Sequence, residues 1–226
     1  SALRRANAIV AVSEAVAAEL REAALPSIHV LPNIVDGAEV NRIAEETARL
    51  PLPDRFVLFV GKLEANKGAR DLIPAMAHAK TALPLVVLGS GSWQSAVREQ
   101  AAKQGIEVHM PGWSERDDVL RAMKRATALI FPSTWPEPLS RVLLEALALG
   151  TPIAAMDTGG TSELIEDDVS GLLASDAEQL GDALGRIVHD AALRLRLKEG
   201  AALRARSFSP AALVPRYEAL YRGDPR

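Results

Sequence analysis

Short apolar runs alternate with longer amphipathic segments along almost the whole chain of 226 residues. Several of the short runs, including Phe56–Val60 and Leu85–Leu88, are apolar at every position. Such runs are typical of strands that are covered on both faces, as in a parallel sheet flanked by helices. The segments predicted as strands are Ile9–Val12, Ile28–Leu31, Phe56–Val60, Leu85–Leu88, Val108–Met110, Ala128–Phe131, Ile153–Met156 and Gly171–Leu173.

The longer segments between these runs have helical length and periodicity. They are Glu14–Ala24, Gly37–Arg49, Ala69–Lys80, Ser92–Gln104, Arg116–Arg125, Pro138–Ala148 and Ala177–His189. Only helical patterns follow residue 190, over Ala191–Arg206 and Pro210–Tyr221. Alternating strands and helices imply right-handed crossovers, so we expect an α/β fold with a doubly wound, Rossmann-like parallel sheet.

Two breaks in the pattern suggest how the chain is organised. Pro32-Asn33 is a turn signal, and Leu50–Asp54 has the lowest propensity for regular structure. We therefore expect a main domain over residues 50–205. Residues 1–49 are expected to hold a partial unit and a crossing segment, and residues 206–226 a C-terminal helix.

Composition narrows the possible partners. A net charge of −3 provides no basic field to attract nucleic acid or an acidic membrane. Cysteine is absent, which excludes disulfides and thiolate metal sites and fits a reducing cytoplasm. No apolar run approaches the roughly 20 residues of a membrane span, and the first residues do not lead into a signal-peptide core. We therefore expect a soluble cytoplasmic protein.

A basic stretch near the C-terminus has two interpretations. The favoured one is a solvated helix face, because leucines give the segment ordinary amphipathic cover. Contact with a membrane surface is the weaker alternative. The stretch comprises Arg194, Arg196, Lys198, Arg204 and Arg206.

Glycines and small hydroxyl residues follow nearly every predicted strand. In an open parallel sheet, ligands bind beyond the carboxyl ends of the strands, where the backbone must approach them closely. The segments at these ends are Gly61–Gly68, Gly89–Ser92, Pro111–Ser114, Pro132–Pro138 and Asp157–Thr161.

The segment Pro138–Ala148 is apolar around most of its predicted helical circumference. Its only charges are Arg141 and Glu145, and Glu137 directly precedes it. Spacing by four places these three residues on one stripe. A single charged stripe on a buried helix indicates a cleft, although Arg141 and Glu145 are also spaced for an ordinary surface ion pair.

The separation of the two glutamates suggests a ligand. Eight helical residues span about 12 Å, which is roughly the length of an extended sugar–diphosphate–ribose unit. Glu145 is placed to bind a ribose diol, and Glu137 to bind hydroxyls at the other end. Phosphates between them would meet the helix amino terminus, with Lys62 and Lys67 balancing their charge. Alternatively, these are solvated loop lysines or partners of Glu64.

Several motifs together resemble a known family. They are Gly61-Lys62 with Lys67-Gly68, Gly89-Ser90-Gly91, Pro132-Ser133, Glu137-Pro138 through Glu145-Ala146 and Gly150, and Gly159-Gly160 with Glu163. This order resembles the donor domain of family 4 glycosyltransferases, which are retaining enzymes with the two-domain GT-B fold. Glu137 and Glu145 match that family's E-x7-E motif in spacing and context.

The resemblance implies a role for each matching position. Lys62 and Lys67 would bind the donor diphosphate, Glu137 the sugar and Glu145 the ribose. Glu137, Lys62 and Lys67 are the expected catalytic residues. The other expected donor-binding residues are Gly61, Gly89, Met110, Gly112, Trp113, Leu139, Ser140, Arg141 and Glu145, with the base near Met110, Gly112 and Trp113 and the sugar and phosphates near the amides of residues 139–141.

Two positions depart from the family pattern. Ser140 stands where glycine is common, which changes how closely the backbone approaches the sugar. Lys62 stands in place of arginine, so a point charge replaces a bidentate fork. The chain has no D-x-D sequence. The family's usual metal independence implies that lysines and a helix terminus stabilise the departing diphosphate, so no cofactor or metal is predicted.

The resemblance also implies a partner. The family's N-terminal domain supplies the acceptor pocket, whereas residues before Pro51 resemble only its last βα unit, at Ile9–Ser13, and the crossing into the donor domain. We therefore expect this chain alone to bind a UDP- or GDP-linked hexose without transferring it. The alternative is a non-catalytic nucleotide-sugar-binding subunit that docks on a separate acceptor chain.

A dinucleotide-dependent oxidoreductase is disfavoured. Gly89-Ser90-Gly91 follows a strand, but position 94 is Gln, so the G-x-G-x-x-G pattern is incomplete. In addition, no acidic residue follows at the expected ribose position near residue 110.

Overall fold

The computed structural model describes residues 2–47 and 49–223. Its strands form two separate sheets. β1 (Ile9–Ala11) and β2 (Ile28–Val30) pair in parallel near the N-terminus, and six strands form one larger parallel sheet. These six are β3 (Val57–Val60), β4 (Leu85–Leu88), β5 (Val108–Gly112), β6 (Ala128–Phe131), β7 (Ile153–Met156) and β8 (Leu172–Ala174). The expected doubly wound α/β fold is confirmed.

The strand order creates a switch point in the larger sheet. The order is β5-β4-β3-β6-β7-β8, so the chain moves outward from β3 and then returns to lie beside it as β6. Crossovers on the two sides of this point run in opposite directions along the sheet. Ligands of open α/β sheets bind at such a point, beyond the strand carboxyl ends.

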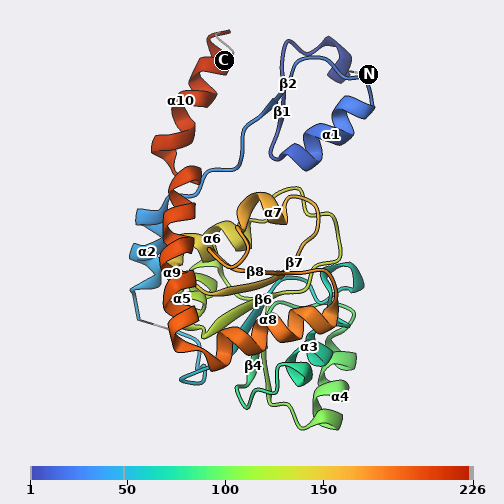
Figure 1. Cartoon of the computed structure of the whole chain (residues 1–226), viewed down its shortest axis with the longest axis vertical. Coiled ribbons are helices and arrows are strands. Elements are labelled where there is room, and N and C mark those ends of the chain that lie inside the picture. Colours follow the sequence, from blue (N-terminus) through green and yellow to red (C-terminus); the bar gives the residue numbers. More distant parts are fainter. Residues whose placement is uncertain (1, 48, 224–226) are drawn as a thin grey trace.

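Helices cover both faces of this sheet (Figure 1). In chain order the α-helices are α1 (Glu14–Glu22), α2 (Gly37–Ala44), α3 (Leu72–His78), α4 (Gln94–Gln104), α5 (Arg116–Arg125), α6 (Arg141–Leu149), α7 (Thr161–Leu164), α8 (Ala177–His189), α9 (Ala191–Ala205) and α10 (Pro210–Tyr221). Of these, α1 and α10 lie away from the large sheet. No helix in the described ranges is long and apolar enough to cross a membrane.

The fully apolar strands bury side chains on both sides. Leu58 of β3 belongs to a cluster with residues of α2, α5 and α6, whereas Val57 and Phe59 belong to a second cluster with residues of α3, α4 and α8. Successive strand residues point to opposite faces. The continuous apolar runs therefore result from burial on both faces of the sheet.

Several predicted boundaries were wrong. The helix expected over Pro138–Ala148 begins only at Arg141, because Ser140 has an extended backbone and its hydroxyl caps the Leu143 amide. α7 was not predicted. β5 continues through Pro111 to Gly112, which an edge strand tolerates. The helix expected over Gly37–Arg49 ends at Ala44, and Ala48 lies outside the described residues.

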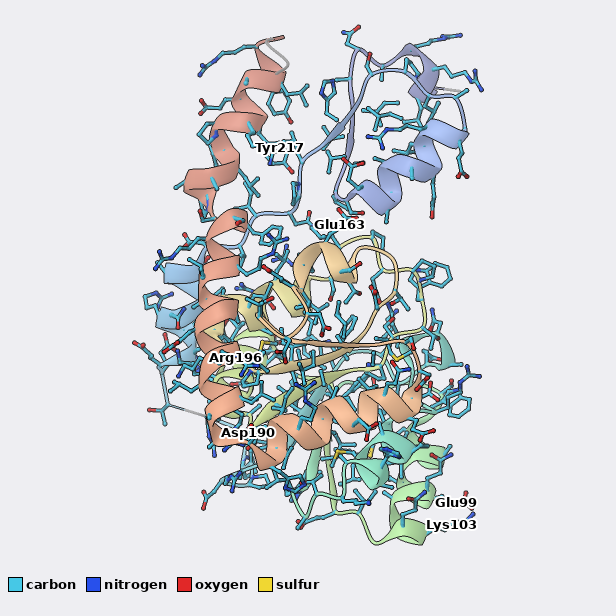
Figure 2. The ribbon with its side chains drawn as sticks, viewed as in Figure 1. Glu99, Lys103, Glu163, Asp190, Arg196 and Tyr217 are labelled. Atoms are coloured by element: carbon cyan, nitrogen blue, oxygen red, sulfur yellow. The ribbon has the colours of Figure 1, made fainter. Side chains whose placement is uncertain are left out.

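Side chains of α7 and α10 are among those that join the N-terminal residues to the larger unit (Figure 2). Glu163, on α7, accepts hydrogen bonds from the Glu14 and Ala15 amides at the start of α1, at 2.7 and 2.9 Å. Tyr217, on α10, bonds through its hydroxyl to the Leu31 and Pro32 carbonyls. Glu163 thus holds the start of α1, and Tyr217 holds the segment that follows β2.

Candidate functional site

A cavity of about 110 Å³ lies at the switch point between β3 and β6. Its apolar wall is formed by Phe59, Val60, Phe131 and Val142. Its remaining lining includes five residues predicted from the sequence, namely Gly61, Lys62, Lys67, Glu137 and Ser140, together with Pro132 and Ser133. Segments far apart in the sequence thus converge where the topology favours ligand binding.

Glu137 is buried and bound by two side chains. Its Oε1 accepts hydrogen bonds from Lys67 Nζ at 2.5 Å and from Ser133 Oγ at 2.7 Å. Its backbone carbonyl also accepts a bond from the Gly160 amide at 2.7 Å. These contacts fix the carboxylate at the cavity wall.

The position of Glu137 differs from the sequence prediction. α6 begins at Arg141, so Glu137 lies in the preceding loop and does not share a helical stripe with Arg141 and Glu145. The loop after β7 determines its backbone position, since a Cβ on Gly159 would lie 2.6 Å from the Glu137 nitrogen. The predicted spacing of about 12 Å along one helix is therefore incorrect.

Lys67 is placed by a short loop after β3. It ends the 3₁₀ turn Ala65–Lys67, and Gly68 follows in the left-handed region at φ 72°. A Cβ on Gly68 would lie 1.9 Å from the Pro132 carbonyl oxygen. The Asn66 carbonyl accepts the Thr134 and Trp135 amides at 3.1 and 3.0 Å. The loops that carry Lys67 and Glu137 are thus joined backbone to backbone.

Lys62 is exposed at the rim of the cavity. The alternative partner considered for the two lysines, Glu64, instead accepts hydrogen bonds from Ser92 Oγ at 2.6 Å and the Ser92 amide at 3.0 Å. These bonds from Ser92 lower the pKa of the Glu64 carboxyl. Glu64 therefore joins the loop that carries Lys62 and Lys67 to the segment just before α4.

Ser140 lines the cavity as the N-cap of α6. Its hydroxyl accepts the Leu143 amide at 3.4 Å, and its carbonyl accepts the Leu144 amide at 3.1 Å. The first amides of a helix have no intrahelical acceptor and attract anions. The amides of Arg141 and Val142 lie in this first turn, beside the two lysines.

Glu145 is buried on α6 and is paired with a residue that the sequence did not suggest. Its Oε1 accepts a hydrogen bond from Arg116 Nε at 2.7 Å, whereas Arg141 lies 4.0 Å away and is 70% exposed. The alternative interpretation, a surface ion pair between Arg141 and Glu145, is therefore met only at the limiting distance of 4.0 Å. The one feature of the sequence that indicates a site role for Arg116 is its position at the start of α5, just beyond β5.

Among the predicted residues that do not line this cavity, four lie in or just after β4 and β5, and Leu139 precedes α6. The Gly89 amide bonds to the Gly112 carbonyl at 2.8 Å, and a Cβ on Gly89 would lie 1.9 Å from the Gly61 oxygen. Gly89 thus serves backbone packing. Met110 accepts a hydrogen bond from Arg98 through its sulfur, and Trp113 is 72% exposed. Leu139 is buried in the core.

The arrangement can bind a ligand that is both anionic and rich in hydroxyls. Glu137 is an acceptor for hydroxyls, while Lys62, Lys67 and the first turn of α6 present positive charge and free donors. Glu145 provides a second buried acceptor one turn further along. Sequence reasoning did not assign a role to Ser133 or Arg116, which hold the two glutamates.

Known proteins resemble this chain in sequence over most of its length. The sequence profile described as Glycosyl transferases group 1 matches residues 42–204. A D-inositol 3-phosphate glycosyltransferase from Xylanimonas cellulosilytica is 32% identical over 230 residues, covering 88% of this chain and 54% of that protein. The alpha-D-kanosaminyltransferase of Streptomyces kanamyceticus is 28% identical, covering 98% of this chain and 61% of that protein.

Solved structures share the fold. Anabaena HepE, crystallised with UDP and glucose, superposes with a TM-score of 0.84 at 21% identity, covering 97% of this chain and 64% of that chain. The chain spans about half the length of the curated relatives it matches, between 51% and 61% for the first three.

Proposed function

Since the chain belongs to the glycosyl transferases group 1 family, we propose that it is the donor-binding domain of a retaining glycosyltransferase. In this proposal, residues 50–205 bind a UDP- or GDP-linked hexose. Residues 1–49 and 206–226 connect them to an acceptor-binding domain. The observation that supports it best is the pair of buried glutamates, Glu137 and Glu145, each bound by a cation near the switch point.

Lys67 links the sugar and diphosphate parts of the proposed donor. An ammonium group has three donors, and the bond to Glu137 occupies one of them. The remaining donors are available to phosphate oxygens, with Lys62 at the rim. Glu137 keeps acceptor capacity for a sugar hydroxyl because its second oxygen, Oε2, is not the atom bound by Lys67 and Ser133.

The nucleoside part is assigned to the α5 and α6 side. Glu145, held by Arg116, accepts the ribose hydroxyls. The base lies against Met110, Gly112 and Trp113 at the end of β5. Amides of residues 139–141 meet sugar and phosphate oxygens at the start of α6. HepE, which has a similar fold, was crystallised with UDP and glucose, and this supports a nucleotide-linked ligand.

The proposed chemistry exchanges one C–O bond for another. The anomeric bond to the diphosphate breaks, a bond to an acceptor oxygen forms on the same face, and the acceptor proton passes to the departing phosphate oxygen. Lys62, Lys67 and the α6 terminus stabilise the negative charge that develops on the diphosphate. No metal is assigned in this proposal, and the cytoplasmic location stays a prediction.

Calorimetry with UDP, GDP and ADP tests the proposal and identifies the base. The folded chain should bind one of them and transfer no sugar to an acceptor on its own. Glu145→Ala should weaken binding of that nucleotide. Lys67→Ala should also weaken it, mainly because a contact with the diphosphate is lost. A folded chain that binds none of the three would refute the proposal, whereas unchanged affinity in both variants would refute the site assignment.

A further inference from the structure

A second cavity, of about 330 Å³, lies at the opposite edge of the large sheet. It is lined by residues just before three strands: Arg55 before β3, Thr127 before β6, and Thr151 before β7. Ligands of open α/β sheets ordinarily bind at the other edge, beyond the carboxyl ends. This cavity is therefore separate from the proposed donor site.

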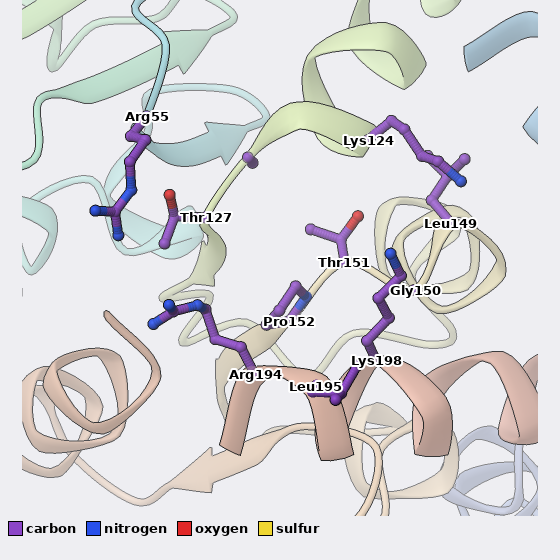
Figure 3. A pocket seen from close by; sticks show the side chains of 11 residues that line it. Arg55, Lys124, Thr127, Leu149, Gly150, Thr151, Pro152, Arg194, Leu195 and Lys198 are labelled. Atoms are coloured by element: carbon purple, nitrogen blue, oxygen red, sulfur yellow. The ribbon is translucent and has the colours of Figure 1, made fainter. Parts of the chain in front are cut away.

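Four cationic side chains surround the cavity (Figure 3). Arg55 and Arg194 lie on one side of it, and Lys124 and Lys198 lie on the other. Among the residues that the structure describes, no aspartate or glutamate lines it. Walls of one charge sign concentrate the field inside a cleft and raise the local concentration of anions.

The contacts made by these cations are to neutral groups. Lys124 donates to the Asn41 side-chain oxygen at 2.7 Å. Arg194 donates to the Ile187 and Val188 carbonyls at 2.7 and 2.8 Å. The aliphatic part of the Lys198 side chain passes over Gly150. A Cβ added to Gly150 would lie 2.9 Å from Lys198 Cγ. The glycine thus leaves room for the lysine.

Helix dipoles offset only part of this charge. The carboxyl ends of α5 and α6 lie here, and each carries roughly half a negative charge, whereas the carboxyl end of α8 and the amino end of α9 adjoin each other and offset one another. The ends of α5 and α6 together supply about −1 against four full positive charges, leaving a surplus of roughly +3. The cations therefore exceed what these helix ends require.

We propose that this cavity binds a small phosphorylated ligand with at least two negative charges. The lysine and arginine donors, together with the Thr127 hydroxyl, suit phosphate oxygens. A volume of about 330 Å³ lies within the range of small-molecule sites. The four cations line a concavity, which favours a small molecule over the flat surface of a membrane.

Calorimetry with inorganic pyrophosphate tests the proposal in a Lys62→Gln/Lys67→Gln background, which removes the lysines of the proposed donor site. Pyrophosphate should still bind with a stoichiometry of about one. Adding Arg55→Gln and Lys198→Gln should weaken it at least about tenfold, because two charge-assisted contacts are lost. Unchanged affinity in this quadruple variant, or no binding in the starting background, would overturn the proposal.

The matched control removes the same charge elsewhere. The side chains of Lys103 and Arg222 are about 70% exposed, and each forms an ion pair with a glutamate four residues earlier, Glu99 and Glu218 respectively. Figure 2 labels Glu99 and Lys103. Lys103→Gln/Arg222→Gln in the same background should change pyrophosphate affinity less than about twofold. An equal loss in the control would show that net charge alone attracts the anion and would overturn the site.

Two further measurements keep the test independent of how the variants fold. In the unaltered chain, pyrophosphate should protect Lys198 from acetylation but leave Lys103 reactive, and equal reactivity would contradict the proposal.

Sedimentation with phosphatidylglycerol vesicles distinguishes the source of the phosphate. Binding to vesicles without binding to free pyrophosphate would replace the small ligand with a membrane surface.

Discussion

Arg116 Nε donates a hydrogen bond to Glu145 Oε1 at 2.7 Å and so joins the start of α5 to α6. The preceding strands, β5 and β6, are separated in the sheet by β4 and β3. The side chain of Glu145 is 9% exposed and that of Arg116 is 42% exposed. A buried carboxylate thus depends on a cation that reaches it from the surface.

We expect Arg116→Gln to lower the free energy of unfolding by about 1–3 kcal/mol, because it leaves a buried carboxylate without its close partner. Arg141→Gln is the matched control, and its expected cost is below about 0.5 kcal/mol because Arg141 is exposed and distant. Urea unfolding measures both. The double variant Arg116→Gln/Glu145→Gln should lose less unfolding free energy than the two single variants lose together. If the loss equals their sum, the two side chains are not coupled.

Ser133→Ala should weaken binding of the sugar more than binding of the nucleotide. The Ser133 hydroxyl, which is buried, orients Glu137, and its loss should cost about 1–2 kcal/mol in affinity for UDP- or GDP-glucose. The free nucleoside diphosphate should bind nearly as before. Calorimetry with both ligands measures the difference. Thr134→Ala, which removes an exposed hydroxyl, is the control, and an equal effect there would contradict the assignment.

Gly68→Ala should displace Lys67 and destabilise the fold by more than about 3 kcal/mol. The new Cβ would lie 1.9 Å from the Pro132 carbonyl oxygen, and the backbone is in the left-handed region. Gly105→Ala has a similar φ of +66° and no atom within 4 Å, so only the backbone cost of about 1–2 kcal/mol applies. Thermal and urea unfolding should separate the two variants, and equal losses would show that the contact with Pro132 is unimportant.

Stability should fall in acid through Glu46. Arg121, which is buried on α5, donates to Glu46, and this hydrogen bond lowers the pKa of the Glu46 carboxyl below its ordinary value. Because the folded pKa is the lower one, the stabilisation is present at neutral pH and is lost as pH falls through that value. Between about pH 5 and pH 3, the unfolding free energy of the parent should fall more steeply than that of Glu46→Gln. Parallel pH profiles would contradict this linkage.

Local pattern was sufficient to locate the strands. Each of the eight predicted strand segments overlaps a strand, since runs such as Leu85–Leu88 are apolar throughout and can be buried on both faces. The sequence also identified the switch-point loops, because glycines and small residues follow β3 and β6. Gly61, Lys62, Lys67, Glu137 and Ser140 line one cavity as a result.

The start of α6 shows where local pattern is insufficient. Apolar periodicity extends back to Pro138. However, the Ser140 hydroxyl bonds to an amide of the first turn, so Ser140 is the N-cap and the helix begins at Arg141. Glu137 is consequently placed by Lys67, Ser133 and Gly160, which come from three other loop positions. Helical spacing could not predict these contacts.

The sequence by itself determined the fold class, the strand positions and the two glutamates, because burial pattern and motif spacing are properties of the chain. Only the tertiary structure decided which cations pair with them. Lys67 bonds to Glu137 across 70 positions, and Arg116 bonds to Glu145 across 29. Partners so far apart in sequence are brought together by the order of strands in the sheet, which no local pattern encodes.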